Sequence, residues 1–442
     1  MAEKAGFPFT ALRFAADGRL TVGPTELVPA GTTDVIVLSH GWKNDEADAD
    51  ALYEGILRNV RVAASGDLVA GGRQWAAVGV YWPAFRFRPD LTLLPGDGAG
   101  AEGGASAIGD VDLPTDELRA YAAALADEFG IDDPQPFAAL AVDARGGGGK
   151  ADAFVERLRA ALLEADGDEV RVDHAALLED PGRELVADMR DGGSFSAAEA
   201  GAEEPAESAG GAASFHSVRE RLARLRSGGA AAVARLLNQA TYYEMKARAG
   251  SVGAALSREL AARLPGGVRL HLVGHSFGGR LVTAAAAGDG DLPIESLSLL
   301  QAAYSHNGLG TGFGAGNRTA GAFRKVIEDR LVAGPVLVTH THRDSAVGFF
   351  YALASTVSGT IASSFGAERL MGGPDDLHGG MGANGAQHMK PGEAVAHVAG
   401  GAPVALVRSK VNNVLSDAIV KDHNDVANAP VGALVWQAVS TA

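Results

Sequence analysis

The sequence of 442 residues contains no cysteine. Disulfide bonds, thiolate metal ligands and a cysteine nucleophile are therefore excluded. No stretch approaches the ~20 uninterrupted apolar residues of a membrane-spanning helix. The first residues also lack the apolar run of about 7–15 residues that a secretory signal needs. We therefore expect no integral membrane segment and a cytoplasmic location, with export by a route that needs no cleaved signal left open.

Positive charge is also scarce, because 38 lysine and arginine residues stand against 54 acidic ones, a formal net charge of −16. A field of this sign repels the phosphates of nucleic acids and anionic membrane surfaces. We therefore expect no nucleic-acid partner, whereas neutral esters and lipids stay possible ligands. Nothing in the composition indicates an oligomeric state.

Apolar residues make up 47% of the chain, enough for a buried core. Short apolar runs alternate with helical patterns at both ends of the sequence, which is typical of an α/β fold with a mostly parallel sheet. The predicted strands are 34–39, 74–82, 268–273, 295–300, 335–339 and one within 406–419, with a hairpin of 12–14 and 20–22. The predicted helices are 47–64, 116–129, 151–165, 217–264, 281–287, 322–331 and 425–439.

The length exceeds the ~250–300 residues at which a single core stops growing. We expect residues 1–95 and 232–442 to form one α/β core, with helices flanking the sheet. Residues 96–231 then form a mainly helical cap or insertion. Within it, residues 191–214 are rich in Ser, Gly, Ala and Glu and poor in apolar residues, so we expect a flexible segment there.

The most informative motif is Gly274-His275-Ser276-Phe277-Gly278, which follows the predicted strand 268–273 and precedes a predicted helix. A serine hydroxyl attacks a carbonyl only when a base removes its proton and the backbone holds it clear of the chain. The G-x-S-x-G turn meets the second condition, because the glycines leave room for a tight strand-to-helix bend. Ser276 is therefore the predicted nucleophile.

With this motif the sequence resembles the α/β-hydrolase superfamily of serine esterases and lipases, over both ends of the chain but not over the insertion. In that family the nucleophile follows the fifth strand, and a His-Gly segment follows the third. His40-Gly41-Trp42, after the predicted strand 34–39, matches the latter. The resemblance implies an oxyanion hole made by the backbone N–H groups of Trp42 and Phe277.

The family order of nucleophile, acid and histidine then points to Asp344 and His423. Asp344 lies just past the predicted strand 335–339, and His423 lies between the last predicted strand and helix. Asp375 and Asp376 are alternatives for the acid, and His388 and His397 for the base. The resemblance thus implies a Ser276–His423–Asp344 triad that forms an acyl-enzyme intermediate and needs no cofactor or metal.

The sequence indicates the substrate less specifically than it indicates the reaction. Tyr304 and His306 follow the predicted strand 295–300, at the edge of the sheet where ligands bind. We expect these two, with His40, Gly41 and His275, to contact a small-molecule or lipid ester. Amidase, thioesterase or phospholipase activity and a non-catalytic binding role stay open. The spacing His340-x-His342-x-Asp344 overlaps the start of a two-metal motif, but Ser345 stands where the next histidine is needed.

Overall fold

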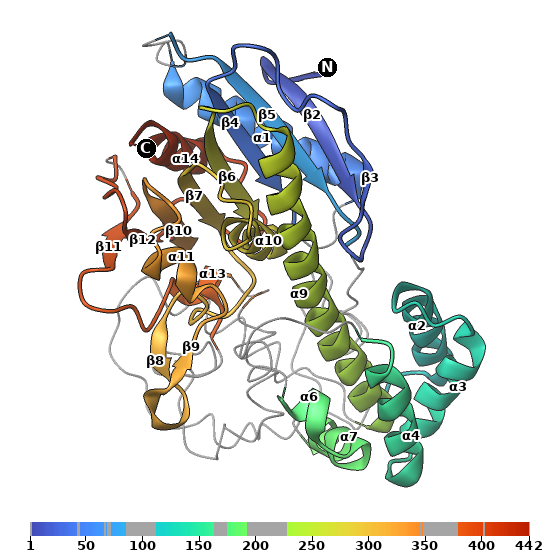
Figure 1. Cartoon of the computed structure of the whole chain (residues 1–442). Helices are drawn as coiled ribbons and strands as arrows, with labels where there is room; N and C mark the ends of the chain where they lie inside the picture. Colours follow the sequence, from blue (N-terminus) through green and yellow to red (C-terminus); the bar gives the residue numbers. More distant parts are fainter. Residues whose placement is uncertain are drawn as a thin grey trace, which may run out of the picture.

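One mixed sheet of 10 strands runs through the described part of the chain (Figure 1). The structure is a computed structural model that describes residues 2–41, 45–65, 68, 72–84, 112–162, 175–191, 228–344, 347, 379–400 and 403–441. The sheet order is β1-β2-β5-β4-β6-β7-β10-β12-β11, with β3 paired to β2. β1 and β3 are antiparallel to β2, and every other neighbouring pair is parallel. The bounds are β1 (Ala2–Lys4), β2 (Phe7–Phe14), β3 (Leu20–Val22), β4 (Asp34–Ser39), β5 (Trp75–Tyr81), β6 (Arg269–His275), β7 (Ile294–Leu300), β10 (Val336–His340), β11 (Ala394–Val398) and β12 (Val411–Leu415).

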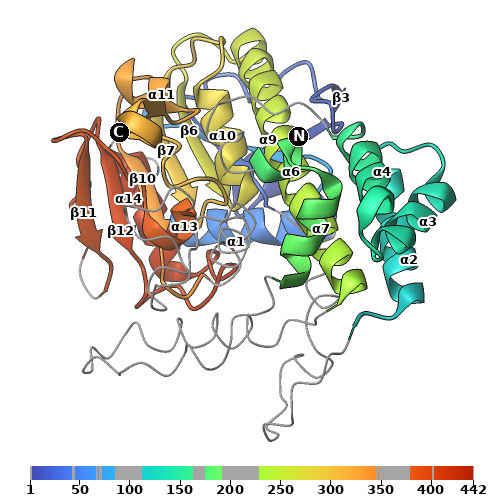
Figure 2. The same ribbon diagram turned by 90° about the horizontal axis from the view of Figure 1, so that it is seen from below.

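Helices cover both faces of this sheet (Figure 2). The strand β4 shows why, because its side chains alternate between two apolar clusters. Val35 and Val37 join the cluster on the side of α9 and α10, whereas Ile36 and Leu38 join the cluster on the side of α1 and α14. A strand buried on both faces reads as a continuous apolar run, as 34–39 does. The flanking elements are α1 (Glu46–Ala64), α9 (Gly229–Arg263), α10 (Phe277–Ala286), α11 (Arg324–Glu328), α13 (Met381–Asn384) and α14 (Ala429–Thr441), with a small hairpin of β8 (Thr311–Phe313) and β9 (Thr319–Ala320) and a 3₁₀ turn, η4 (Ala315–Asn317), between its strands.

The chain between β5 and β6 is helical wherever the structure describes it at length. Its helices are α2 (Thr115–Glu128), α3 (Pro134–Ala144), α4 (Gly148–Arg159), α6 (Ala175–Glu179) and α7 (Gly182–Asp191). They pack beside the first half of α9, which then continues along the sheet to β6 (Figure 1). This confirms a helical segment between strands. The predicted domain boundaries stay predictions, and residues 192–214 of the expected flexible segment lie outside the described residues.

Most predicted elements occur close to their predicted bounds, although β2 begins at Phe7 and α10 at Phe277, earlier than predicted. The structure also contains elements that were not predicted from the sequence, namely β1, α3, α6, α7, the hairpin of β8 and β9, α13 and the edge strand β11. The last helix begins at Ala429 rather than near 425, because Asn428 Oδ1 accepts the N–H of Val431 and so caps it. Among the described helices, none is long and apolar enough to cross a membrane.

A buried charge cluster ties the strands together at the end of the sheet where β4 and β6 begin. The carboxylate of Asp34 is fully buried and accepts hydrogen bonds from Arg73 and from Arg269, at 2.7 Å and 2.9 Å. His271 Nε2 lies 3.4 Å from the same carboxylate. Burial alone raises the pKa of Asp34, but the bonds from His271, Arg269 and Arg73 outweigh it and hold that pKa well below its usual range.

Candidate active site

Ser276 occupies the bend between β6 and α10. Its φ of 57° and ψ of −126° place it in the left-handed region that residues other than glycine rarely adopt. Its backbone is fixed on both sides: its N–H donates to Leu300 O at 3.1 Å, and its carbonyl accepts the N–H of Ala303 at 3.0 Å. Such a conformation persists only where surrounding bonds determine it, and it is a feature of nucleophile turns.

The glycines of the motif make this bend possible. A Cβ on Gly274 would lie 2.3 Å from Gly278 O, and a Cβ on Gly278 would lie 2.3 Å from Ser39 O. The turn is therefore packed directly onto the end of β4. Gly41 faces Ser276 in the same way, because a Cβ there would lie 2.4 Å from the Cβ of Ser276. These three glycines are required by close backbone approach.

The structure brings Ser276, His423 and Asp344 together. His423 Nε2 lies 2.8 Å from Ser276 Oγ, and His423 Nδ1 lies 2.9 Å and 3.0 Å from the two carboxylate oxygens of Asp344. The three residues come from loops after β6, β10 and β12, which end at the same edge of the sheet. Since a carboxylate only accepts, Nδ1 carries the proton and Nε2 can accept the serine proton.

Asp344 is fully buried and has further donors around it. Its Oδ1 accepts the N–H of Val347 at 3.0 Å, and its Oδ2 lies 3.5 Å from Gln301 Nε2. Gln301 also donates to Gly382 O at 3.0 Å and accepts from Thr339 Oγ1 at 2.8 Å. Gln301 was not among the predicted site residues, although its place directly after the predicted strand 295–300 was a usable signal.

A second aspartate holds the turn that carries Asp344. Asp417 Oδ1 accepts the Thr341 hydroxyl at 2.6 Å and the His342 N–H at 3.0 Å, and Asp417 Oδ2 lies 2.9 Å from His342 Nδ1. Burial alone raises the pKa of Asp417, but the bonds from His342 and Thr341 outweigh burial and lower that pKa to about 2. The bond to Asp417 raises the pKa of His342. His342 therefore belongs to this turn and not to a shared site with Asp344.

The alternatives to the triad residues have other partners. His388 Nδ1 lies 2.7 Å from Asn307 Oδ1, and His397 Nε2 lies 3.1 Å from Asn412 Oδ1. The alternative acids, at 375 and 376, lie outside the described residues. Within the described ranges, no group of three or more His, Asp or Glu side chains is placed to hold a metal ion.

Of the two residues predicted to form the oxyanion hole, Phe277 lies among the described residues and Trp42 does not. Phe277 is the first residue of α10, so its N–H is at the positive end of a helix and directly follows the nucleophile. Trp42 lies outside the described residues, and its contribution stays a prediction. His40 is buried: its ring bonds Gly41 O at 2.8 Å and accepts the Trp82 N–H at 3.3 Å. Burial lowers the pKa of His40 to about 4, so it is neutral and braces the β4 end.

Two residues expected to contact substrate are enclosed by protein. Tyr304 is fully buried, with its hydroxyl 3.1 Å from Thr283 Oγ1 and its ring against Phe323. His306 is also fully buried, and its Nδ1 lies 3.3 Å from Asn384 Nδ2. Both side chains help pack the loop after β7. A direct contact of either with substrate stays a prediction.

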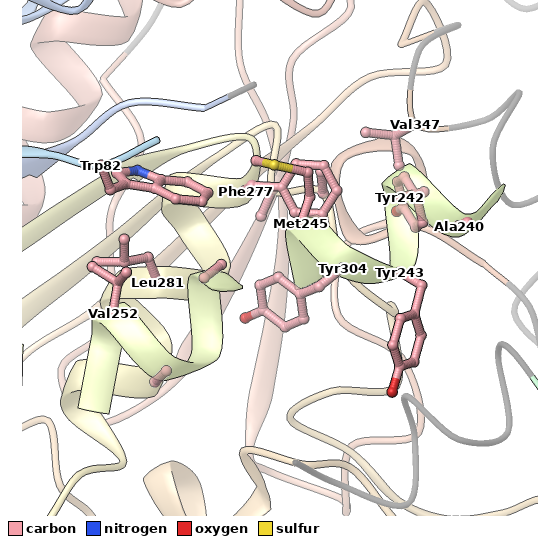
Figure 3. Packing of buried hydrophobic residues seen from close by; sticks show 14 of the residues in the cluster. Trp82, Ala240, Tyr242, Tyr243, Met245, Val252, Phe277, Leu281, Tyr304 and Val347 are labelled. Atoms are coloured by element: carbon pink, nitrogen blue, oxygen red, sulfur yellow. The ribbon is translucent and has the colours of Figure 1, made fainter. Parts of the chain in front are cut away.

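An apolar cluster lies beside the bend (Figure 3). The Tyr242 ring of α9 is 5.1 Å from the Phe277 ring, and Met245 lies next to Phe277 in the same view. On the other side, Trp82 stacks on His40 with 5.6 Å between ring centroids. Aromatic and apolar groups from α9, from the start of α10 and from the residue after β5 thus lie around the bend.

Comparisons with protein-family models, with curated proteins and with solved structures found no match. The assignment of this site therefore depends on its geometry and on the sequence motif. The geometry brings Ser276, His423 and Asp344 together at one edge of the sheet, and the G-x-S-x-G motif surrounds Ser276.

Proposed function

We propose that this chain is a serine hydrolase of the α/β-hydrolase kind, acting on carboxylic esters. One observation carries the proposal: the unbroken relay from Ser276 Oγ through His423 to Asp344, with contacts of 2.8 Å and 2.9 Å. The strained backbone of Ser276 supports it, since such strain is a mark of functional sites.

The chemistry follows from the positions of the groups. His423 Nε2 takes the proton of Ser276 as Oγ attacks the ester carbonyl carbon. The carbonyl oxygen becomes negative and is stabilised by the N–H of Phe277 and, as the resemblance implies, by that of Trp42. The imidazolium then gives its proton to the departing alcohol, and an acyl group remains on Ser276. Water, deprotonated by His423, releases the acid.

Asp344 keeps the ring of His423 in the tautomer that these reaction steps need, with the proton on Nδ1. Its negative charge also stabilises the imidazolium formed in each half-reaction, while the proton stays on the ring. The carboxylate is fully buried, which strengthens its effect on the ring beside it. The triad needs no cofactor or metal for any of these steps.

The α/β-hydrolase assignment is also supported by the order of the site residues along the sheet. The nucleophile follows β6 in the middle of the sheet, the acid follows β10 and the histidine follows β12. Counted along the chain, the bend comes one strand later than the resemblance implies, because the short strands at the start add to the count. The helical segment between β5 and β6 is the proposed cap that sets substrate choice.

The test is a matched series of ester, thioester and amide substrates with one acyl group, assayed with wild type and Ser276→Ala. We expect ester hydrolysis by wild type, its loss in Ser276→Ala, and no effect of a chelator. Faster turnover of the thioester or amide would assign the enzyme to one of those classes. Measurable hydrolysis at equal rates by the two proteins would contradict catalysis by Ser276. No hydrolysis of any substrate by wild type would favour a binding role.

A further inference from the structure

His275, the residue before the nucleophile, points at the loop that carries the base. Its side chain is buried, at 5% exposure, and its Nε2 lies 2.9 Å from the backbone carbonyl oxygen of His423. The two imidazole rings lie side by side, with 5.0 Å between their centroids. A residue fixed on β6 is thus bonded to the main chain of a residue in the loop between β12 and α14.

The direction of this bond is fixed by chemistry. A carbonyl oxygen only accepts, so His275 Nε2 carries the proton and donates it. Burial, with a further contribution from His423, lowers the pKa of His275 to about 3. The ring therefore stays neutral with a single proton over the working range of pH. Its Nδ1 is buried and has no hydrogen-bond partner among the described residues, which leaves Nε2 as the atom that does the bonding.

Within the part of the chain that the structure describes, the loop of His423 is hydrogen-bonded to β6 and its bend through the bond from His275 and through the contact of His423 Nε2 with Ser276 Oγ. Its own turns are closed by short-range bonds, such as the N–H of Asn424 to Asp422 Oδ1 at 2.8 Å. Asn59 of α1 holds the loop further on, by donating to Ala427 O at 2.7 Å. Near the reacting atoms, the bond from His275 thus links the main chain of His423 to the end of β6.

We propose that His275 is a positioning residue, which fixes the backbone of His423 relative to the strand that ends in Ser276. This inference rests on the proposed function. It replaces the substrate-contact role expected from the sequence with a bond to the base loop. Since a misplacement of about 1 Å can cost about 10²-fold in rate, one main-chain bond at this place has a large effect on turnover.

Two conservative substitutions separate this role from simple packing. In His275→Gln the side-chain amide N–H reaches the place of imidazole Nε2, so the bond to the carbonyl is kept. In His275→Asn the shorter amide reaches only the place of Nδ1, and the bond is lost. His271→Gln is the matched control, because His271 is a buried histidine on the same strand whose ring bonds Ser296 Oγ at 2.9 Å.

Two measurements are made on each full-length protein. The first is kcat and KM for a soluble short-chain ester, with the active sites counted by titration. We expect His275→Asn to lower kcat by about 10- to 100-fold with little change in KM, and His275→Gln to restore most of it. The control His271→Gln should lose stability and keep its kcat.

The second measurement is hydrogen exchange of the peptide that covers residues 416–428, which needs no activity. We expect faster exchange in His275→Asn and wild-type exchange in His275→Gln and in the control. A raised KM with unchanged kcat would assign His275 to substrate binding instead. Unchanged kcat and exchange in His275→Asn would overturn the proposal, whereas absence of hydrolysis in wild type with altered loop exchange would overturn only the proposed function.

Discussion

Replacing Asp344 by asparagine changes one oxygen for an NH₂ group at the inner end of the triad. Asp344 Oδ1 accepts the N–H of Val347 at 3.0 Å, whereas its Oδ2 faces Gln301 at the longer distance of 3.5 Å. The new amide therefore keeps its oxygen toward Val347 and turns its NH₂ toward His423 Nδ1. The NH₂ group donates toward Nδ1 at the 2.9 Å place of Oδ2, which favours the tautomer with the ring proton on Nε2, although the retained oxygen stays 3.0 Å from Nδ1.

With the proton on Nε2, His423 donates toward Ser276 Oγ and can no longer take its proton. In a serine protease triad the same substitution leaves the geometry intact and lowers kcat by about 10⁴. That fall corresponds to about 5.4 kcal/mol, at about 1.36 kcal/mol for each factor of ten. We expect a loss of this size for Asp344→Asn, with KM changed little because the carboxylate is fully buried beside His423 Nδ1.

The assay is release of a chromogenic alcohol from a short-chain ester, with the folded fraction of each variant measured by circular dichroism. Asp417→Asn is the matched control, because Asp417 also bonds a histidine Nδ1 at 2.9 Å but stands outside the triad. A large loss at Asp344 with a small one at Asp417 is the expected result. Wild-type turnover by folded Asp344→Asn, or equal losses in the two variants, would refute the reasoning.

The remaining predictions concern packing and charge. Along α9, Gly250→Ala should raise the free energy of unfolding by up to about 1 kcal/mol, since nothing lies within 4 Å of the new Cβ. Gly253→Ala should instead lower it by about 1–3 kcal/mol, because its Cβ would lie 2.3 Å from a carbonyl of α10; urea titration of both decides. Asp34→Asn should cost about 1–3 kcal/mol, because it removes the buried carboxylate that accepts hydrogen bonds from the partly exposed Arg73 and Arg269. Because folding lowers the pKa of Asp34, its contribution to the free energy of unfolding of wild type should be complete above about pH 4 and should be lost as the pH falls. Asp34→Asn should lack this part of the pH dependence, because asparagine does not titrate. Gly41→Ala should lower kcat at least about 10²-fold, because its Cβ would press on the Cβ of Ser276 at 2.4 Å; unchanged kcat in the folded variant would show that this approach is not needed.

The sequence was sufficient for the parts of the site that depend on local pattern. The strand 34–39 contains the continuous apolar run VIVL, which predicts a strand well because burial on both faces demands such a run. The run before the bend, VRLHLV, alternates apolar and polar residues, which is also a strand pattern. Asp344 and His423 were predicted because each follows a predicted strand in the order that the resemblance to α/β-hydrolases implies, and the carboxyl ends of parallel strands meet at one edge. Their placement next to Ser276 follows from topology, which the strand order supplies.

Other features depend on contacts between distant segments and have no local signal. The edge strand β11 carries the sequence AVAHV on a half-covered edge, where alternation is weak. The bond from Gln301 toward Asp344 spans separate loops, and the bond from His275 to the His423 carbonyl needs the loop conformation. The identity of a side chain gives its donors and acceptors, but only the fold decides which partner each one meets.

The most direct test of the account is covalent labelling with a fluorophosphonate, followed by mass spectrometry of the digested protein. Attack by Oγ on phosphorus displaces fluoride and requires the same base and the same polarised nucleophile as attack on an ester. We predict a single phosphonyl adduct on the peptide that contains Ser276, its absence in Ser276→Ala, and much slower labelling in Asp344→Asn. An unlabelled wild type, or an adduct on another serine that persists in Ser276→Ala, would contradict the assignment of Ser276 as the nucleophile.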